Sequence, residues 1–243
     1  MRHKYPCRNT VFVCILSSLP DTNAVIIEQL VRLYMDVETY RPDSAGAFVN
    51  EKIILIAFLK DESAFSVDSL TVDPELIAFP NDGPSEENEI LKRSLDLVRD
   101  MRLTHRIVDV IGFNILRFDI PLIISKASEN NIDSVANLSK LWNDNYCADH
   151  FQLLLPANNR LFKGLRLDNV VRLAKELNLS PKPPDSYGRS KDIKDLHEQR
   201  KYDEILKHCV ADLKIVRWLD LYGTRALLRK AVGSNMPMFF NSQ

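Results

Sequence analysis

The seven residues Leu33–Thr39, LYMDVET, constrain what this chain can fold into more than any other stretch. Their alternation predicts a β-strand that points Asp36 and Glu38 to one face and apolar side chains to the other. Two carboxylates about 7 Å apart on one strand face repel each other, and a divalent cation between them relieves that repulsion. A second Asp-x-Glu triplet, Asp73–Glu75, has a proline at its centre, which removes a ladder donor. The triplet at Asp36 therefore indicates a metal site if other motifs supply the remaining ligands.

Length and composition favour one large α/β domain over two small ones. The 243 residues can bury a substantial core, and 45% hydrophobic with 27% charged residues is ordinary for a soluble globular protein. No apolar run reaches the roughly 18 residues of a membrane span, so no membrane partner is expected. A net charge of −1 provides no overall positive field that would attract nucleic acid. Net charge is a poor guide for a site made of carboxylates, however, because the acids subtract charge and the bound metal ions add it back.

The four cysteines do not have the spacing of a metal-binding cluster. They stand at positions 7, 14, 147 and 209 and contain no Cys-x-x-Cys pair. We expect reduced thiols in a cytoplasmic protein, with a disulfide between Cys7 and Cys14 as the open alternative.

Residues 1–29 are expected to be an N-terminal extension. Arg2, His3 and Lys4 precede the apolar run Val11–Leu19, which faintly imitates a secretory signal. The run is short, contains two serines and has no small-residue cleavage site directly behind it. An extra strand or an ill-ordered extension is therefore favoured over a signal peptide.

Alternating strand and helix patterns along the chain predict an α/β fold. After the first strand, the patterns predict strands at 52–59, 65–72, 107–112 and 148–155, and helices at about 22–30, 85–101, 121–128, 134–142, 168–177 and 202–219. The first two strands are separated by a short stretch without a convincing helix pattern, so a hairpin and a mixed sheet are expected. Asp168 is expected to cap its helix, turns are expected at 81–84 and 158–159, and 180–189 is the clearest loop.

A second informative stretch is Gly112–Pro121, GFNILRFDIP. It reads as a strand end, a polar turn at Asn114, and Asp119 at the mouth of a helix, facing the helix dipole and its free N–H groups. A capped helix alone explains Asp119 but not the whole combination.

The third stretch is His208–Asp212, HCVAD, on the last predicted helix. Residues four apart lie on one helix face, so this imidazole and this carboxylate can reach the same point. His105 and Asp109 have the same spacing, and such a pair taken alone is more often a surface feature.

The ordered set MDVET, GFNILRFDIP and HCVAD resembles the DEDD superfamily of 3′-5′ exonucleases. It is most similar to the stand-alone relatives of the proofreading exonuclease domain of family B DNA polymerases. The resemblance runs from about Leu33 to Tyr222 and includes the segments DHFQLLLP and FKGLRLDNVV. It implies an RNase H-like mixed β-sheet flanked by α-helices over residues 30–232, followed by a tail at 233–243.

The resemblance also implies two divalent cations, Mg²⁺ or Mn²⁺, that clamp a phosphodiester. By similarity, Asp36 bridges both metals, Glu38 and Asp212 complete the site that activates water, and Asp119 holds the second metal. The backbone around Val37 and Thr39, together with Asn114, is implied to hold the terminal nucleotide.

The third motif departs from both usual patterns of this superfamily. His208 has the residue type of the histidine branch, but the three residues between it and Asp212 match the spacing of the tyrosine branch. Imidazole can exchange a proton at neutral pH, so we hypothesise that His208 either deprotonates or orients the attacking water.

The sequence thus predicts a metal-dependent exonuclease that removes nucleotides from the 3′ end of DNA, single-stranded or frayed. An exoribonuclease that trims RNA and a catalytically weak nucleic-acid-binding scaffold remain the alternatives. No polymerase or helicase segment is recognisable in the chain, so a proofreading or DNA repair role is expected to need a replication or repair partner. The cations of the long loop are expected either to follow a phosphate backbone or to form an ordinary solvated surface: Lys182, Arg189, Lys191 and Lys194.

Overall fold

A five-stranded mixed sheet forms the centre of the protein, in the order β3-β2-β1-β4-β5. The computed structural model describes residues 28–42, 48, 50–63, 73–80, 87–232 and 239. β2 runs antiparallel to β1 and β3, whereas β4 runs parallel to β1, and β5 parallel to β4. The strands are β1 (Glu28–Tyr40), β2 (Lys52–Asp61), β3 (Glu75–Pro80), β4 (His105–Gly112) and β5 (Tyr146–Asp149).

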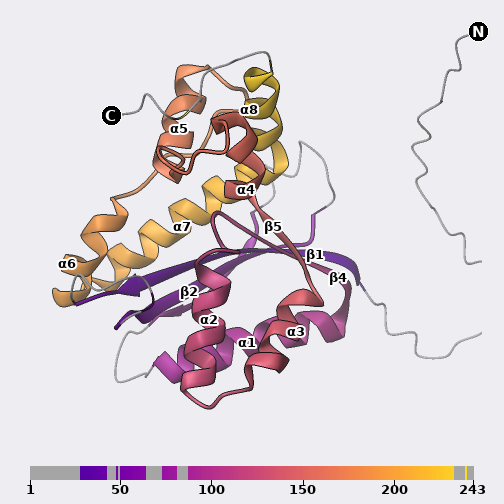
Figure 1. Ribbon diagram of the computed structural model, residues 1–243, viewed down its shortest axis with the longest axis vertical. Helices are drawn as coiled ribbons and strands as arrows, with labels where there is room; N and C mark the ends of the chain where they lie inside the picture. The colour runs from indigo at the N-terminus through magenta and orange to yellow at the C-terminus, as the bar shows by residue number, and fades with distance from the viewer. Residues whose placement is uncertain are drawn as a thin grey trace, which may run out of the picture.

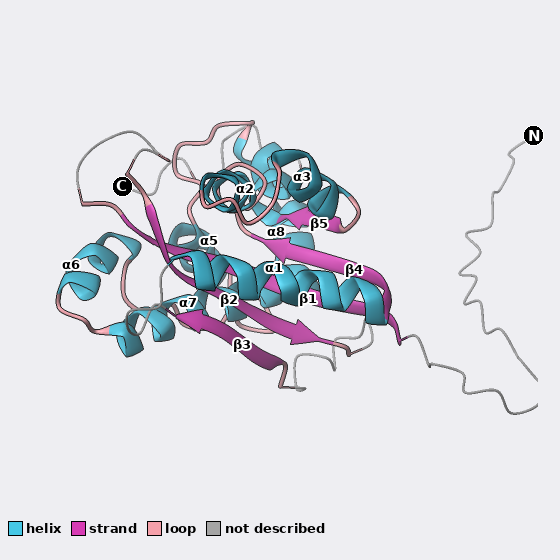
Figure 2. Cartoon of the chain, turned by 90° about the horizontal axis from the view of Figure 1, so that it is seen from below, coloured by secondary structure: helices cyan, strands magenta, loops and turns pink. Residues whose placement is uncertain are grey.

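Helices cover both faces of this sheet (Figure 1). Helices α1 to α3 lie against one face, and Figure 2 shows α1 crossing it, while α7 packs on β1 and β2 from the opposite face. This arrangement, with its β1–β2 hairpin, confirms the predicted RNase H-like α/β fold. The helices are α1 (Glu87–Thr104), α2 (Asp119–Glu129), α3 (Val135–Asn143), α4 (His150–Leu154), α5 (Leu167–Glu176), α6 (Ile193–Glu198), α7 (Tyr202–Trp218) and α8 (Thr224–Ala231). Within the described ranges, none of them has the length and apolar character needed to cross a membrane.

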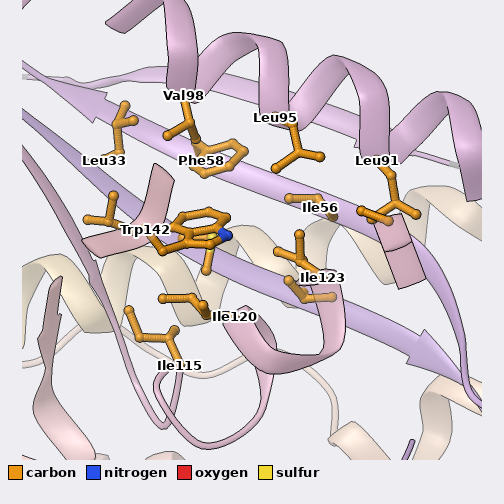
Figure 3. Packing of buried hydrophobic residues seen from close by; sticks show 14 of the residues in the cluster. Leu33, Ile56, Phe58, Leu91, Leu95, Val98, Ile115, Ile120, Ile123 and Trp142 are labelled. Carbon is orange, nitrogen blue, oxygen red and sulfur yellow. The ribbon is translucent and has the colours of Figure 1, made fainter. Parts of the chain in front are cut away.

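The alternation of β1 divides the interior into two cores. One face of the strand packs against α1, α2 and α3, where apolar side chains at helical spacing meet it (Figure 3). Because β1 is the middle strand, both of its faces are covered, which is why most of its side chains, including those of Arg32 and Glu38, are buried. The first core contains Val31, Leu33, Met35 and Val37 of β1, Phe58 of β2, Leu91, Leu95 and Val98 of α1, and Ile120, Ile123 and Trp142.

The second face of β1 is held against α7 by apolar packing and two polar ties. Tyr34 is buried in a cluster with the α7 side chains Cys209 and Leu213. Its hydroxyl donates to Asp220 at 2.9 Å, in the π-helical segment Leu219–Gly223 that follows α7. At the end of β2, the buried Asp61 accepts a hydrogen bond from Arg217 of α7 at 2.8 Å. These contacts fix the helix that faces Asp36 and Glu38.

The predicted strand at 148–155 is wrong beyond its first two residues. β5 ends at Asp149, whose carboxylate accepts the N–H of Phe151 at 2.9 Å and so caps α4. The apolar run that follows is therefore helical, with Phe151 and Leu154 turned inward and Leu153 exposed. Apolar periodicity over so short a run does not separate a strand from a helix.

Asp168 does not cap α5, contrary to the prediction. It lies in the first turn of that helix, after the N-cap residue Arg166, and its carboxylate accepts the N–H of Asn169 at 2.9 Å. An acid in the first turn still faces the positive end of the helix dipole.

Several predictions concern residues outside the described ranges: the N-terminal extension with Cys7 and Cys14, the extended stretch at 65–72, and the turn at 81–84. The helix predicted at 22–30 is wrong where it can be compared, because Glu28–Leu30 begin β1. The sequence reading also missed β3, an edge strand that begins directly after Pro74, where the absent N–H interrupts no ladder.

Leu95→Ala tests the first core, because Leu95 is fully buried between α1 and the sheet. Removing its side chain should lower the free energy of unfolding by about 2–5 kcal/mol, measured by denaturant titration. Leu103→Ala on the same helix is the matched control, since Leu103 is 82% exposed and should change stability little. Equal effects of the two substitutions would contradict the described packing.

Candidate active site

Asp36 and Glu38 stand on the face of β1 that α7 covers. Ligand atoms of Asp36, Glu38 and Cys209 of α7 lie within 4.8 Å of one another. The pairing of β1 with β2 shifts between Glu38 and Thr39, a bulge directly beside the two acids. The central strand thus delivers two carboxylates to the same point as a helix that follows it by about 170 residues of sequence.

Asp119 reaches this cluster from the other side of the fold. It is buried as the first residue of α2, after a turn in which Asn114 adopts a left-handed backbone with φ 70°. Gly112 permits the close approach of that turn, because a Cβ there would lie 2.1 Å from Ile115 and 3.0 Å from the carbonyl of Met35. Burial and the charge of Asp36 raise the pKa of Asp119 well above its ordinary value.

α7 presents His208 and Asp212 together on the face turned toward β1. The His208 Nε2 lies 3.6 Å from Glu38 Oε1 and 3.7 Å from Asp212 Oδ2. Its Nδ1 hydrogen-bonds the backbone carbonyl of Tyr187. Because a carbonyl only accepts, Nδ1 carries a proton and Nε2 is the nitrogen that faces the carboxylates.

The four acids of the three motifs influence one another electrostatically, so they share one neighbourhood. Burial raises the pKa of each, and repulsion from Asp36 raises the pKa of Glu38, Asp119 and Asp212 further. Burial, with the charges of Asp36 and Asp168, raises the pKa of Asp212 to about 8. Among the described residues, the groups that lower the pKa of these acids are backbone N–H groups, Cys209 and His208, and none of them is a Lys or an Arg.

The donor set fits hard divalent cations. Carboxylate oxygens from three separate elements converge here, and carboxylate oxygens are the ligands that bind Mg²⁺ or Mn²⁺. Asp36, Glu38, Asp119 and Asp212 are the residues that could hold such ions.

Cys209 is a member of the cluster that sequence reasoning did not assign. Burial and the charges of Asp36 and Glu38 raise the pKa of its thiol well above the ordinary value, so the thiol stays protonated. It hydrogen-bonds Asp36 and thereby lowers the pKa of that carboxyl. Its place inside HCVAD was the available signal, but nothing in the sequence shows that it faces β1.

Asp149 is the second residue that the sequence reading missed. Its carboxylate accepts the backbone N–H groups of Asn114 at 2.8 Å, Leu116 at 3.1 Å and Phe151 at 2.9 Å. These bonds hold the turn that leads into Asp119, so Asp149 is a positioning residue. The available signal was its place in the segment DHFQLLLP, but the prediction put Asp149 near the start of a strand and gave it no role.

A cleft of about 670 Å³ opens beside the carboxylates. Asp36, His208, Asp212 and Asn114 line it, so the structure places Asn114 beside the carboxylates. Its remaining walls are apolar side chains, the start of α5, and the long loop with the residues that follow it: Phe113, Phe151, Leu165, Arg166, Leu167, Asp168, Ser186, Gly188, Arg189, Ser190, Lys191 and Val216.

The other residues predicted to hold a nucleotide offer only their backbone. The Val37 side chain is buried in the first core, and the Thr39 hydroxyl donates to Glu51 at 2.7 Å. Of the loop cations, Arg189 and Lys191 line the cleft, whereas the ammonium of Lys194 donates to the carbonyl of Pro42 at 2.7 Å.

Comparison with known proteins places the fold. No family profile matches the sequence, and no curated protein matches it. The family B DNA polymerase from the hyperthermophilic archaeon Pyrobaculum calidifontis matches 86% of this chain with 26% of its own, at a TM-score of 0.54 and 12% identity. This likeness shows the fold, and the chain spans about a quarter of that polymerase.

Two structures of E. coli exonuclease I match more weakly. The zinc-bound complex with single-stranded DNA covers 83% of this chain and 42% of its own, at 16% identity and a TM-score of 0.43. The complex with a 5cy-dT13 oligonucleotide covers the same shares at 15% identity and a TM-score of 0.39.

Asp149→Ala should destabilise the protein by about 2–4 kcal/mol, because three backbone N–H groups lose their acceptor, and that of Phe151 is buried. The measurement is the free energy of unfolding from denaturant titration. Asp144→Ala, at an exposed acid in the turn just before β5, is the matched control and should have little effect. A stability unchanged by Asp149→Ala would show that the turn before Asp119 does not depend on this carboxylate.

Proposed function

We propose that this protein is a metal-dependent exonuclease that hydrolyses phosphodiester bonds at the 3′ end of single-stranded or frayed DNA. The observation that carries the proposal is the convergence of four carboxylates and His208 beside a cleft, on the fold that the polymerase comparison identifies. No lysine or arginine in the described ranges offsets the charge of these acids, and phosphodiester hydrolysis is a reaction that acid-bound cations promote.

Asp36, Glu38 and Asp212 would hold one cation, and Asp36 with Asp119 the other. Two such ions, when bound, supply an activated water and stabilise the negative charge of the leaving oxygen. The protein itself contributes the fixed placement of the four carboxylates on β1, α2 and α7, which needs no rearrangement as the substrate enters.

His208 is positioned to act on the attacking water. Its Nε2 faces Glu38 and Asp212, while the Tyr187 carbonyl holds the ring by Nδ1. Nε2 accepts a proton as the water oxygen bonds to phosphorus, the bond between phosphorus and the 3′-oxygen breaks, and the 3′-oxygen takes up a proton from solvent. The product is a nucleoside 5′-monophosphate and a strand shorter by one nucleotide.

The cleft suits a single strand with an unpaired end. Its apolar walls can contact a base, and Asn114, Arg189 and Lys191 supply polar groups and positive charge for the sugar and phosphate. The same features serve RNA, so matched DNA and RNA oligonucleotides in one assay decide the sugar preference.

Degradation of a 5′-labelled single-stranded oligonucleotide tests the proposal. We expect stepwise shortening from the 3′ end with Mg²⁺ or Mn²⁺, and none with a chelator. Asp36→Asn should reduce the rate by roughly 10³-fold or more, because it removes a carboxylate from the metal site. Asp100→Asn, at an exposed acid on α1, is the control and should leave the rate unchanged.

A second readout does not depend on activity. Mn²⁺ should raise the thermal midpoint of the parent protein and raise that of Asp36→Asn much less, since binding to the native state stabilises it. If the protein binds the oligonucleotide but does not cleave it in the presence of metal, the proposal of an enzyme is wrong and a nucleic-acid-binding scaffold is favoured.

His208→Ala should lower the rate roughly 10²- to 10⁴-fold if Nε2 takes the proton. His208→Gln separates the two roles, because glutamine can orient water but cannot accept its proton at neutral pH. An equally slow glutamine variant supports the general base, and near-normal turnover by glutamine supports orientation alone. Unchanged turnover by the alanine variant would remove His208 from the mechanism.

A further inference from the structure

A stack of planar side chains extends from the cleft wall to the surface. Phe151 lines the cleft. Its ring meets that of Phe113 edge-on, with 5.6 Å between the ring centroids. It lies parallel to the ring of Phe162, with 5.7 Å between the centroids and 9° between the ring planes. The guanidinium of Arg117 covers Phe162, 4.2 Å from its ring centre, and lies 5.7 Å from that of Phe151. We call Phe162 and Arg117 the aromatic platform.

The platform is exposed, although the Phe151 ring beneath it is buried. Phe151 is 5% exposed, whereas Phe162 is 53% exposed and Arg117 is also at the surface. A single exposed phenylalanine is ordinary, but this one is held parallel to a second ring and under an arginine.

The charge around the platform is positive. The segment 160–167 reads RLFKGLRL, with three cations and no acid. Arg166 at its end lines the cleft, and its guanidinium lies 3.5 Å from the carboxylate of Asp168. Within the described ranges Arg117 makes no ion pair, so its charge is available to an anionic ligand. Positive charge beside an aromatic surface is the combination that binds single-stranded nucleic acid.

We propose that the aromatic platform is a second nucleotide subsite, on which a base upstream of the 3′ end stacks while the terminal nucleotide occupies the cleft. This inference rests on the proposed function and adds the form of the substrate. Every base has an aromatic face, so the platform accepts any sequence. In a duplex those faces are covered by neighbouring bases, so the platform selects single strands.

The test measures binding of a 5′-fluorescent oligothymidylate to the full chain carrying Asp36→Asn, by anisotropy with Mg²⁺ present. Adding Phe162→Ala should weaken binding roughly 5- to 100-fold. Phe162→Trp should retain or improve it. Tyr146→Ala is the matched control, because Tyr146 is an aromatic residue 68% exposed at the far end of β5 from Asp149, and it should change nothing.

An abasic strand of the same length and charge separates stacking from charge. Phe162→Ala should leave its binding unchanged, and the salt dependence for oligothymidylate should keep its slope, since the phosphate contacts remain. Unaltered oligothymidylate binding by Phe162→Ala, or an equal loss on both strands, would overturn the platform. A parent protein that binds neither strand would instead overturn the nuclease proposal itself.

Discussion

Repulsion among buried carboxylates is the constraint around which this protein is built. Four acids are held together here although they repel one another: Asp36, Glu38, Asp119 and Asp212. The charge of Asp36 raises the pKa of each of the other three. The packing on both faces of β1 supplies the opposing free energy, because removing the acids from one another would open the core. The buried Asp61–Arg217 pair and the Tyr34–Asp220 hydrogen bond keep α7 in place above the acids.

The same constraint explains why the supporting groups are polar. Asp149 gathers three N–H groups to fix the turn before α2, and the Tyr187 carbonyl fixes one nitrogen of His208. Cys209 hydrogen-bonds Asp36 without adding charge, since burial keeps its thiol protonated. A site poised to receive cations thus uses neutral groups for orientation and leaves its negative charge for the ions.

The unusual spacing of the third motif is consistent with the helix geometry of α7. Residues four apart lie one turn apart on the same face, so His208 and Asp212 both reach Glu38 or its neighbourhood. The imidazole therefore stands within the carboxylate cluster without the longer separation of the histidine branch. This placement makes a proton-accepting role for Nε2 geometrically reasonable in the proposed reaction.

The sequence by itself determined the features that follow from local periodicity: the strand faces of Leu33–Thr39, the α1 and α7 faces, the β1–β2 hairpin and the mixed sheet. It also indicated Asp119 at a helix start, because turn chemistry and helix polarity are local. Only the tertiary structure decided that Cys209 touches Asp36, that Asp149 holds the turn at Asn114, and that residues 150–154 are helical. The first two facts depend on contacts between segments about 30 to 170 residues apart in the sequence, and periodicity carries no information about which distant surfaces meet. The helix at 150–154 begins at the local Asp149 cap, and the apolar run is too short for its periodicity to separate a helix from a strand.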